Sequence, residues 1–248
     1  YPKLNFIRTK FWSLSKKKIS TITCPTSELM NDLKKKKIFQ ENKITILYDA
    51  ILNIKDFNSK IKNKEFMPPF KIPDSFILSV GRLTKQKNYF YLLNEFKKIV
   101  NRYPDQKLLI VGEGELKEKI ENLINRLNLS NSVFLIGHTN NVYYYMKKAK
   151  VFVLSSLWEE VGFVIVEAAL SNSLIISSDC KNGPKEFLEN GKAGFLFNNN
   201  QEKDLFNSFI LLMEENKKNI LEKKIRAKKN SIKFTMFRHQ IQLKKLLH

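Results

Sequence analysis

Two acids flank an apolar run just past the middle of the chain, in LWEEVGFVIVEAAL (157–170). Glu159 and Glu167 lie eight residues apart, and Glu160 follows the first. A carboxylate is a good hydrogen-bond acceptor for sugar hydroxyls, whether of a ribose or of a hexose. The two acids could therefore reach different parts of one bound molecule, although an isolated glutamate is more often an exposed acid of a loop or helix face.

The middle of this stretch predicts a helix that begins near Phe163 or Val164 and packs against a sheet through its apolar run. The free backbone N–H groups of Gly162, Phe163 and Val164 would favour a negatively charged ligand. Because Gly162 has no side chain, a ligand could approach the backbone closely there.

Two cations follow an expected strand at 75–81, in GRLTKQKN (81–88). Arg82 and Lys87 lie five residues apart, and two cations close to a helix N-terminus could clamp a diphosphate. The alternative is two solvated surface cations, which are common in so basic a chain. The later stretch GEGE (112–115) is neither a dinucleotide fingerprint nor a Walker loop, and we interpret it as a tight turn between a strand and a helix.

A regular alternation of strands and helices must position these residues. Short apolar runs predict buried strands at 75–81, 107–112, 133–137, 151–156, 173–179 and 194–197. Apolar residues at helical spacing predict helices between them at 92–103, 116–127 and 141–149. The fold class is therefore α/β, with a parallel sheet covered by helices on both faces. Ligands of such sheets bind outside the carboxyl ends of the strands, where both clusters lie.

The flanking segments have a different pattern. Strands are predicted at 18–27 and 43–51, a short helix capped by Thr26 or Ser27 at 27–37, and a polar linker with three prolines at 53–74. Residues 201–248 predict helices. The expected parts are a remnant of another domain with the start of the linker, the rest of the linker, a Rossmann-like domain and C-terminal helices, at 1–65, 66–74, 75–200 and 201–248.

The composition supports a packed, strongly basic protein. The 248 residues are 43% hydrophobic, which argues against disorder. Lys and Arg number 44 against 24 Asp and Glu, which gives a net charge of +20. Such a charge attracts nucleic acid, anionic lipid or phosphorylated ligands, although part of the lysine excess could be compositional bias.

Cys24 and Cys180 form no CxxC pair or disulfide framework, which suits a reducing cytoplasm. We expect that Tyr1 is not the natural N-terminus.

Taken together, these motifs resemble the retaining glycosyltransferases of family 4, whose GT-B fold has two Rossmann-like domains facing each other across a cleft. The resemblance extends from about Ser20 to the C-terminus. Besides the acidic stretch, it rests on SVGRLTKQKN, LLIVGEGELKEKI, NSVFLIGHTNNVYYYMKKAKVFVLSS and NGPKEFLENGKAGFLF. It implies a GT-B-type C-terminal Rossmann-like domain plus a remnant of the N-terminal domain, and the sequence looks most like transferases that build bacterial surface polysaccharides.

The resemblance implies roles for the charged candidates. Arg82 and Lys87 would neutralise the leaving diphosphate of a nucleotide sugar. Glu159 would be the catalytic residue, in contact with the donor sugar near the reaction centre. Glu167 would bind the ribose hydroxyls of the donor.

It also implies roles for main-chain groups that bind the donor. The N–H groups of Phe163 and Val164 would assist the phosphate, and the main chain around Gly137 and His138 would hold the base. One departure concerns Gly162. The family often has glycine directly after the first glutamate, whereas two residues intervene here, so the loop shape is expected to differ while the spacing of the two acids is kept.

The implied activity is that of a retaining hexosyltransferase. It would move a hexose or N-acetylhexosamine from a nucleoside-diphosphate sugar, expected to be a UDP-sugar, to a saccharide or lipid-linked acceptor in bacterial surface glycan synthesis. No metal or cofactor is expected, since the sequence has no DxD motif and fixed cations and a helix dipole would stabilise the leaving group. The lysine runs 16–18 and 34–37 predict a cytoplasmic protein bound peripherally to the anionic inner face of the plasma membrane.

Other hypotheses stay open from the sequence. A GT-B sugar-nucleotide epimerase or sugar-phosphate synthase would share the architecture. A nucleic-acid-binding protein would share the charge, although no zinc finger, helix-turn-helix or RNP-like motif is present, and no nucleic-acid partner is expected. The chain could also be an inactive donor-binding fragment, because the family's acceptor-binding domain often supplies a histidine and none of His138, His239 and His248 precedes the linker.

Overall fold

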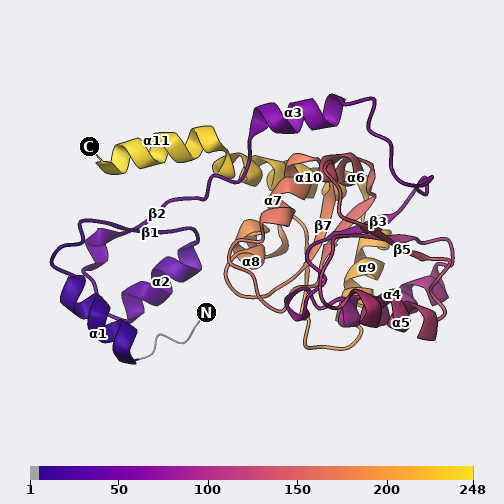
Figure 1. Ribbon diagram of the computed structural model, residues 1–248, viewed down its shortest axis with the longest axis horizontal. Helices are drawn as coiled ribbons and strands as arrows, with labels where there is room; N and C mark the ends of the chain where they lie inside the picture. Colours follow the sequence, from indigo (N-terminus) through magenta and orange to yellow (C-terminus); the bar gives the residue numbers. More distant parts are fainter. Residues whose placement is uncertain (1–5, 248) are drawn as a thin grey trace.

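A parallel sheet forms the centre of the larger part of the protein in the computed structural model, which describes residues 6–247 (Figure 1). Its six strands lie in the order β5-β4-β3-β6-β7-β8. They are β3 (Ile77–Val80), β4 (Leu108–Val111), β5 (Val133–Gly137), β6 (Val151–Leu154), β7 (Leu174–Ser178) and β8 (Phe195–Phe197). Every neighbouring pair is parallel, which confirms the expected fold class. Residues 1–5 of the expected remnant, with Tyr1, and His248 of the expected C-terminal helices lie outside the described residues.

Apolar side chains of the strands point alternately to two cores, one on each face of the sheet. On β3, Leu78 belongs to one core and Ile77 to the other. Helices α6 (Val142–Lys148), α7 (Phe163–Leu170) and α8 (Pro184–Phe187) bury the first face. Helices α4 (Tyr89–Arg102), α5 (Lys117–Arg126) and α9 (Asp204–Glu214) bury the second. Burial on both faces explains why the strands are apolar throughout rather than alternating.

The direction in which the chain crosses the sheet reverses between β3 and β6. From β3 the chain adds β4 and β5 on one side, then returns to β6 and adds β7 and β8 on the other. At the carboxyl end of the sheet the chain therefore continues from β3 and from β6 in opposite directions. Such a switch point leaves a crevice in which α/β proteins bind ligands.

The N-terminal elements form a smaller unit beside this sheet (Figure 1). Strands β1 (Ile22–Cys24) and β2 (Ile44–Ile46) pair in parallel, accompanied by α1 (Phe6–Ser15) and α2 (Ser27–Lys35). The expected cap of α2 is Thr26, whose hydroxyl accepts the Leu29 N–H at 3.2 Å. These elements confirm the strands and helix that the sequence predicted there.

Helix α3 (Ile54–Lys62) lies inside the segment 53–74 that the sequence predicted to be a linker throughout. Asn53 caps it, since its side chain accepts two N–H groups of the first turn at 3.0 and 3.2 Å. Phe57 packs edge-on against Tyr143 of α6, with ring centroids 5.0 Å apart. The prediction of a linker was wrong for α3 because the apolar partner of its few apolar side chains lies far away in the sequence.

The C-terminal helices α10 (Lys217–Ser231) and α11 (Met236–Leu247) confirm the helical end of the chain, and α11 extends over the side of the N-terminal elements (Figure 1). Between α10 and α11 the chain returns to the segment that follows β2. There the N–H groups of Ile51 and Leu52 donate to the Phe234 carbonyl at 3.0 and 2.9 Å. The two parts are therefore joined by backbone hydrogen bonds as well as by the covalent connection.

A second connection is a pair of glutamates, one from each part. The Glu186 carboxylate on α8 accepts the Ser27 N–H at 3.0 and 2.9 Å and the Glu28 N–H at 3.2 Å, both from the start of α2. Glu28 in return accepts the Asn182 N–H at 2.7 Å. A helix N-terminus carries a partial positive charge, so the Glu186 carboxylate stabilises α2 from outside its own domain.

Replacement of Glu186 by Ala should therefore weaken the attachment of the N-terminal elements. Hydrogen bonds to a charged group contribute about 1.5–3 kcal/mol, and we expect the free energy of unfolding in urea to fall by about this amount. Lys185→Ala, at the exposed neighbouring position, is the control. Identical urea midpoints of the two variants would contradict the role of Glu186.

Candidate functional site

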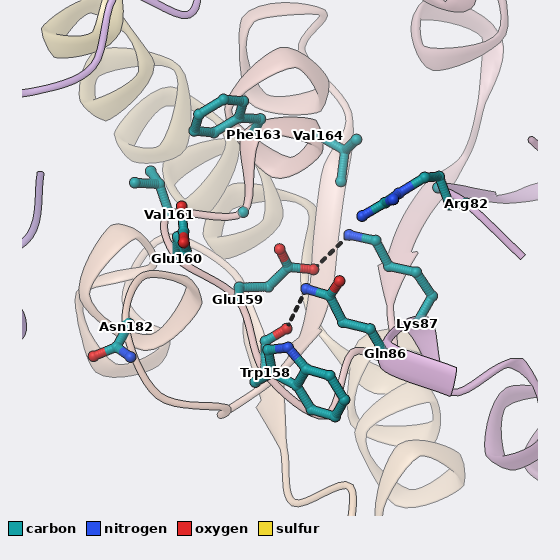
Figure 2. A pocket seen from close by; sticks show the side chains of 12 residues that line it. Arg82, Gln86, Lys87, Trp158, Glu159, Glu160, Val161, Phe163, Val164 and Asn182 are labelled. Atoms are coloured by element: carbon teal, nitrogen blue, oxygen red, sulfur yellow. Dashed lines mark hydrogen bonds and ion pairs between the residues drawn. The ribbon is translucent and has the colours of Figure 1, made fainter. Parts of the chain in front are cut away.

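A cleft of 680 Å³ opens at the switch point, between the loops that follow β3 and β6. Figure 2 shows the residues that line it, which are Gly81, Arg82, Gln86, Lys87, Trp158, Glu159, Glu160, Val161, Gly162, Phe163, Val164 and Asn182. The structure thus brings together in one cleft the two cations, the first acid and the start of α7. This follows from topology, because the carboxyl ends of neighbouring parallel strands meet at one edge of a sheet.

The centre of the cleft is an ion pair between Lys87 and Glu159. Lys87 Nζ lies 2.6 Å from Glu159 Oε1, and the two side chains are only 13% and 8% exposed. The Ser156 hydroxyl donates to the same Oε1 at 2.5 Å. The family resemblance implies that Lys87 and Glu159 contact different parts of a ligand, whereas in the structure the two side chains contact each other directly.

The loop after β3 holds Lys87 in place. Lys87 ends a single 3-10 turn (Lys85–Lys87), and its carbonyl accepts the Ser155 hydroxyl at 2.7 Å. Gly81 makes room for the lysine side chain, because a Cβ at Gly81 would lie 3.0 Å from Lys87 Cε. Arg82 on the same loop is exposed, and Figure 2 shows its guanidinium pointing toward the Lys87 ammonium.

The loop after β6 is tied to the loop after β3. The Leu157 N–H donates to the Gln86 carbonyl at 2.8 Å, and the Gln86 side-chain amide donates to the Trp158 carbonyl at 2.9 Å. Two hydrogen bonds therefore join the two loops that line the cleft. Trp158 itself is 49% exposed, and Figure 2 shows its ring at the rim, beside Gln86.

Helix α7 begins at Phe163, as predicted, and opens onto the cleft. Gly162 adopts the left-handed conformation (φ 78°, ψ 59°) at the cap position, where it has no side chain to cover the helix end. The first N–H groups of a helix have no intrahelical partner, and those of Phe163 and Val164 stand at the cleft. Buried apolar side chains on several sides of α7 hold it against the core, as the apolar run predicted.

Glu167 lies one turn inside α7, half-buried, and accepts the Tyr143 hydroxyl at 3.4 Å. Burial raises the pKa of the Glu167 carboxyl, the Tyr143 hydrogen bond and the Lys60 charge oppose this rise, and Asp56 adds to it. Lys60 and Asp56 come from α3, the helix that the sequence analysis missed. Glu167 is not among the residues that line the cleft.

The residues predicted to hold a base lie at the end of β5. The Gly137 carbonyl accepts the Gly112 N–H at 2.9 Å, and a Cβ at Gly137 would lie 2.9 Å from Glu113 Oε1. His138, the next residue, is exposed. Neither Gly137 nor His138 lines the cleft, so the structure places the base candidates and Glu167 outside the group formed by Arg82, Lys87 and Glu159.

Several residues of the site were missed from the sequence. Ser155 and Ser156 support the ion pair, and the signal for them was their position directly after the apolar run of β6. Asn182 lines the cleft from the loop before α8, and its Oδ1 is buried without a hydrogen-bond partner among the described residues. Asn182 opens the quoted stretch NGPKEFLENGKAGFLF, but no role was assigned to it, because its place at the cleft depends on the contact of its N–H with Glu28.

The described part of the chain has no group of three or more His, Cys, Asp or Glu side chains that could hold a metal ion. Among residues 6–247, no helix has both the length and the apolar character needed to cross a bilayer. The cleft itself presents cations, helix N–H groups and the supported carboxylate of Glu159, a set that can hold phosphate oxygens beside a hydroxyl.

The sequence and the fold both match known proteins. The family described as Glycosyl transferases group 1 matches residues 60–234. An uncharacterized glycosyltransferase of Methanocaldococcus jannaschii is 40% identical over 154 residues, which cover 62% of this chain and 37% of that protein. The N-acetylgalactosamine-N,N'-diacetylbacillosaminyl-diphospho-undecaprenol 4-alpha-N-acetylgalactosaminyltransferase of Campylobacter jejuni is 30% identical over 224 residues, 87% of this chain and 59% of that protein.

A solved structure has the same fold. The structure of HepE from Anabaena in complex with UDP superposes with a TM-score of 0.79 at 18% identity, over 99% of this chain and 68% of that one. The chain thus spans between 37% and 59% of the length of the two relatives named above.

The raised pKa of Glu167 predicts a pH-dependent stability. An acid whose folded pKa is raised binds its proton more tightly in the folded state, so the free energy of unfolding falls as pH rises from the unfolded value of about 4.3 through the folded one. Glu167→Gln keeps an acceptor for Tyr143 without the charge. We expect it to be more stable than the unaltered chain at pH 7 and equal to it near pH 4.

Urea unfolding at a series of pH values measures this difference, with Glu121→Gln on the exposed face of α5 as the control. A gain for Glu167→Gln that stays the same from pH 4 to pH 7 would show that burial of the charge is not its cause.

Proposed function

This chain belongs to the family of glycosyl transferases group 1, and we propose that its cleft binds the nucleoside diphosphate of a sugar donor. The observation that carries the proposal is the meeting of Arg82, Lys87 and the start of α7 in one cleft at the switch point of the sheet. Cations and open helix N–H groups are the groups that bind phosphate in proteins.

Each group has a place in the proposed reaction. Arg82, exposed and pointing inward, contacts the diphosphate from the solvent side, and Lys87 shares its ammonium between Glu159 and a phosphate oxygen. The N–H groups of Phe163 and Val164 add fixed dipoles. Together they stabilise the negative charge that develops on the leaving diphosphate, without reorganisation during the reaction.

In this proposal Glu159 and Glu167 each bind one of the two sugars of the donor. Glu159 contacts the transferred sugar near the reaction centre, and Glu167 binds the ribose hydroxyls once the ligand reaches the inner turn of α7. The main chain at Gly137 and His138 holds the base. The UDP complex of the Anabaena protein supports the choice of a uridine nucleotide.

The whole protein, in our proposal, transfers a hexose or N-acetylhexosamine to a saccharide or lipid-linked acceptor in bacterial surface glycan synthesis, with retention at the anomeric carbon. The name of the Campylobacter relative, a transferase acting on a diphospho-undecaprenol-linked sugar, supports a lipid-linked acceptor. Proton NMR of the product made by the full-length protein tests the stereochemistry. An inverted anomeric centre would rule out retention.

Calorimetry with UDP tests the donor site. Loss of a charge-assisted contact costs about 1.5–3 kcal/mol, so Arg82→Ala should weaken UDP binding about tenfold or more. Glu167→Ala should also weaken it, whereas Glu159→Ala should leave UDP affinity largely intact and abolish transfer by the full-length protein. Arg82 is a cleaner test than Lys87, because loss of Lys87 also leaves a buried carboxylate unpaired.

The matched control is Arg126→Ala, at an exposed position at the end of α5. Equal UDP affinity in Arg82→Ala and Arg126→Ala would remove Arg82 from the site. EDTA should change neither binding nor turnover, and strong inhibition would show that the proposed reaction needs a metal.

We also propose that the protein binds the anionic inner surface of the plasma membrane. Lysines 16–18 and 35–37 are exposed on the N-terminal elements. Phe11 and Leu14 of α1 are exposed as well. Each basic residue close to an anionic surface contributes about 1 kcal/mol, so a few clustered lysines are enough for reversible binding.

Co-sedimentation with vesicles containing phosphatidylserine should therefore show binding that is lost in salt near 1 M, where the Debye length is about 3 Å. Replacement of all three lysines at 16–18 by Gln should weaken it more than the same charge loss at Lys217, Lys218 and Lys228 of α10. Equal binding to neutral vesicles would exclude an electrostatic anchor.

A further inference from the structure

We infer that Ser155 and Ser156, which follow β6 directly, position the Lys87–Glu159 ion pair so that one carboxylate oxygen of Glu159 is left for the sugar donor. They act as positioning residues, because the proposed contacts with the donor belong to Lys87 and Glu159. The inference rests on the proposed donor site and adds the device that gives Glu159 a fixed orientation.

Both donors to the Glu159 carboxylate act on the same oxygen. The Ser156 hydroxyl and the Lys87 ammonium reach Oε1 at 2.5 and 2.6 Å. Among the described residues, no hydrogen bond to Oε2 is found. In Figure 2 this second oxygen points away from Lys87, toward the start of α7. A donor hydroxyl placed between Glu159 and α7 would therefore meet an acceptor whose other oxygen is already occupied.

Ser156 is itself held by the core of the sheet. It is fully buried, and its carbonyl accepts the Ser178 hydroxyl from the end of β7 at 2.7 Å and the Asn199 side-chain amide at 2.5 Å. Two buried donors from different elements thus fix the backbone that carries the hydroxyl. A site whose groups are locked by such supporting hydrogen bonds keeps its geometry without a ligand.

Ser155 fixes Lys87, the other partner of the ion pair, through a hydrogen bond to its main chain. Its hydroxyl donates to the Lys87 carbonyl at 2.7 Å, and its side chain is 1% exposed. Two consecutive serines therefore fix the main chain of Lys87 and the carboxylate of Glu159. The ion pair alone joins two flexible side chains, and a single ammonium contact lets a carboxylate exchange its two oxygens by rotation.

Loss of the Ser156 hydroxyl should therefore change the sugar contact and leave the diphosphate contacts in place. Calorimetry with UDP, UDP-glucose and UDP-N-acetylglucosamine separates the sugar contact from the diphosphate contacts. The ratio of UDP-sugar affinity to UDP affinity measures the contribution of the sugar alone. We expect Ser156→Ala to bind UDP within about twofold of the unaltered chain and to weaken binding of the preferred UDP-sugar about tenfold, the effect of one hydrogen bond to a charged group.

Ser177→Ala is the matched control. Its hydroxyl is fully buried and donates to the Ser178 carbonyl at 3.0 Å, so the control removes one buried hydroxyl without a contact to Glu159. Ser156→Cys keeps a weak donor of similar size and should restore part of the UDP-sugar affinity. Equal weakening of UDP and UDP-sugar in Ser156→Ala, with a lower melting temperature than Ser177→Ala, would show a merely structural role and overturn the inference.

A crystal structure of Ser156→Ala tests the inference without a ligand. We expect the Glu159 carboxylate to turn or to take more than one orientation there, and to keep one orientation in Ser177→Ala. An unmoved carboxylate in Ser156→Ala would overturn the positioning role even if UDP-sugar binds. If the unaltered chain binds neither UDP nor a UDP-sugar while Ser156→Ala shows the turned carboxylate, the donor site fails and the support of Glu159 stands.

Discussion

The buried contact between Lys87 and Glu159 is the constraint around which the site is built. Each charge stabilises the other in the cleft, because removal of one partner leaves the other partly desolvated and unpaired. The pair needs the loops after β3 and β6 at one place, which requires these strands to be neighbours at the centre of the sheet. Gly81 leaves room for the lysine side chain, since a Cβ there would lie 3.0 Å from Lys87 Cε.

The sequence predicted the elements of the larger part well, because buried parallel strands are short apolar runs that are easily recognised. It also placed Arg82, Lys87 and Glu159 in one cleft, since the carboxyl ends of parallel strands share one edge. The direct contact of Lys87 with Glu159 could not be predicted, because the periodicity of apolar residues does not say which strands are neighbours in the sheet. Helix α3 was missed for a similar reason, as Phe57 finds its partner Tyr143 only in the folded chain.

The family match and the geometry of the cleft support the proposed function by different routes. The match covers residues 60–234 and includes both loops, whereas the N-terminal elements before residue 60 lie outside it. Those elements are joined to the cleft through Glu28, which accepts the N–H of the cleft residue Asn182. The GT-B fold brings two domains to one cleft, and this contact shows how the smaller part of the chain reaches the wall of the larger part's site.

The two connections between the parts have a mechanical consequence. One is the crossing where Ile51 and Leu52 donate to Phe234 and His239 Nδ1 lies 2.6 Å from the Tyr48 carbonyl oxygen. The other is the site where Glu186 accepts N–H groups of α2 and Glu28 accepts the Asn182 N–H. A rigid unit that is attached at two places rotates most easily about the axis through both attachments. Asn182 lies at one of the two attachments, so the part of the cleft that it lines would hardly move during such a rotation. Surfaces of the N-terminal elements far from the axis would move the furthest.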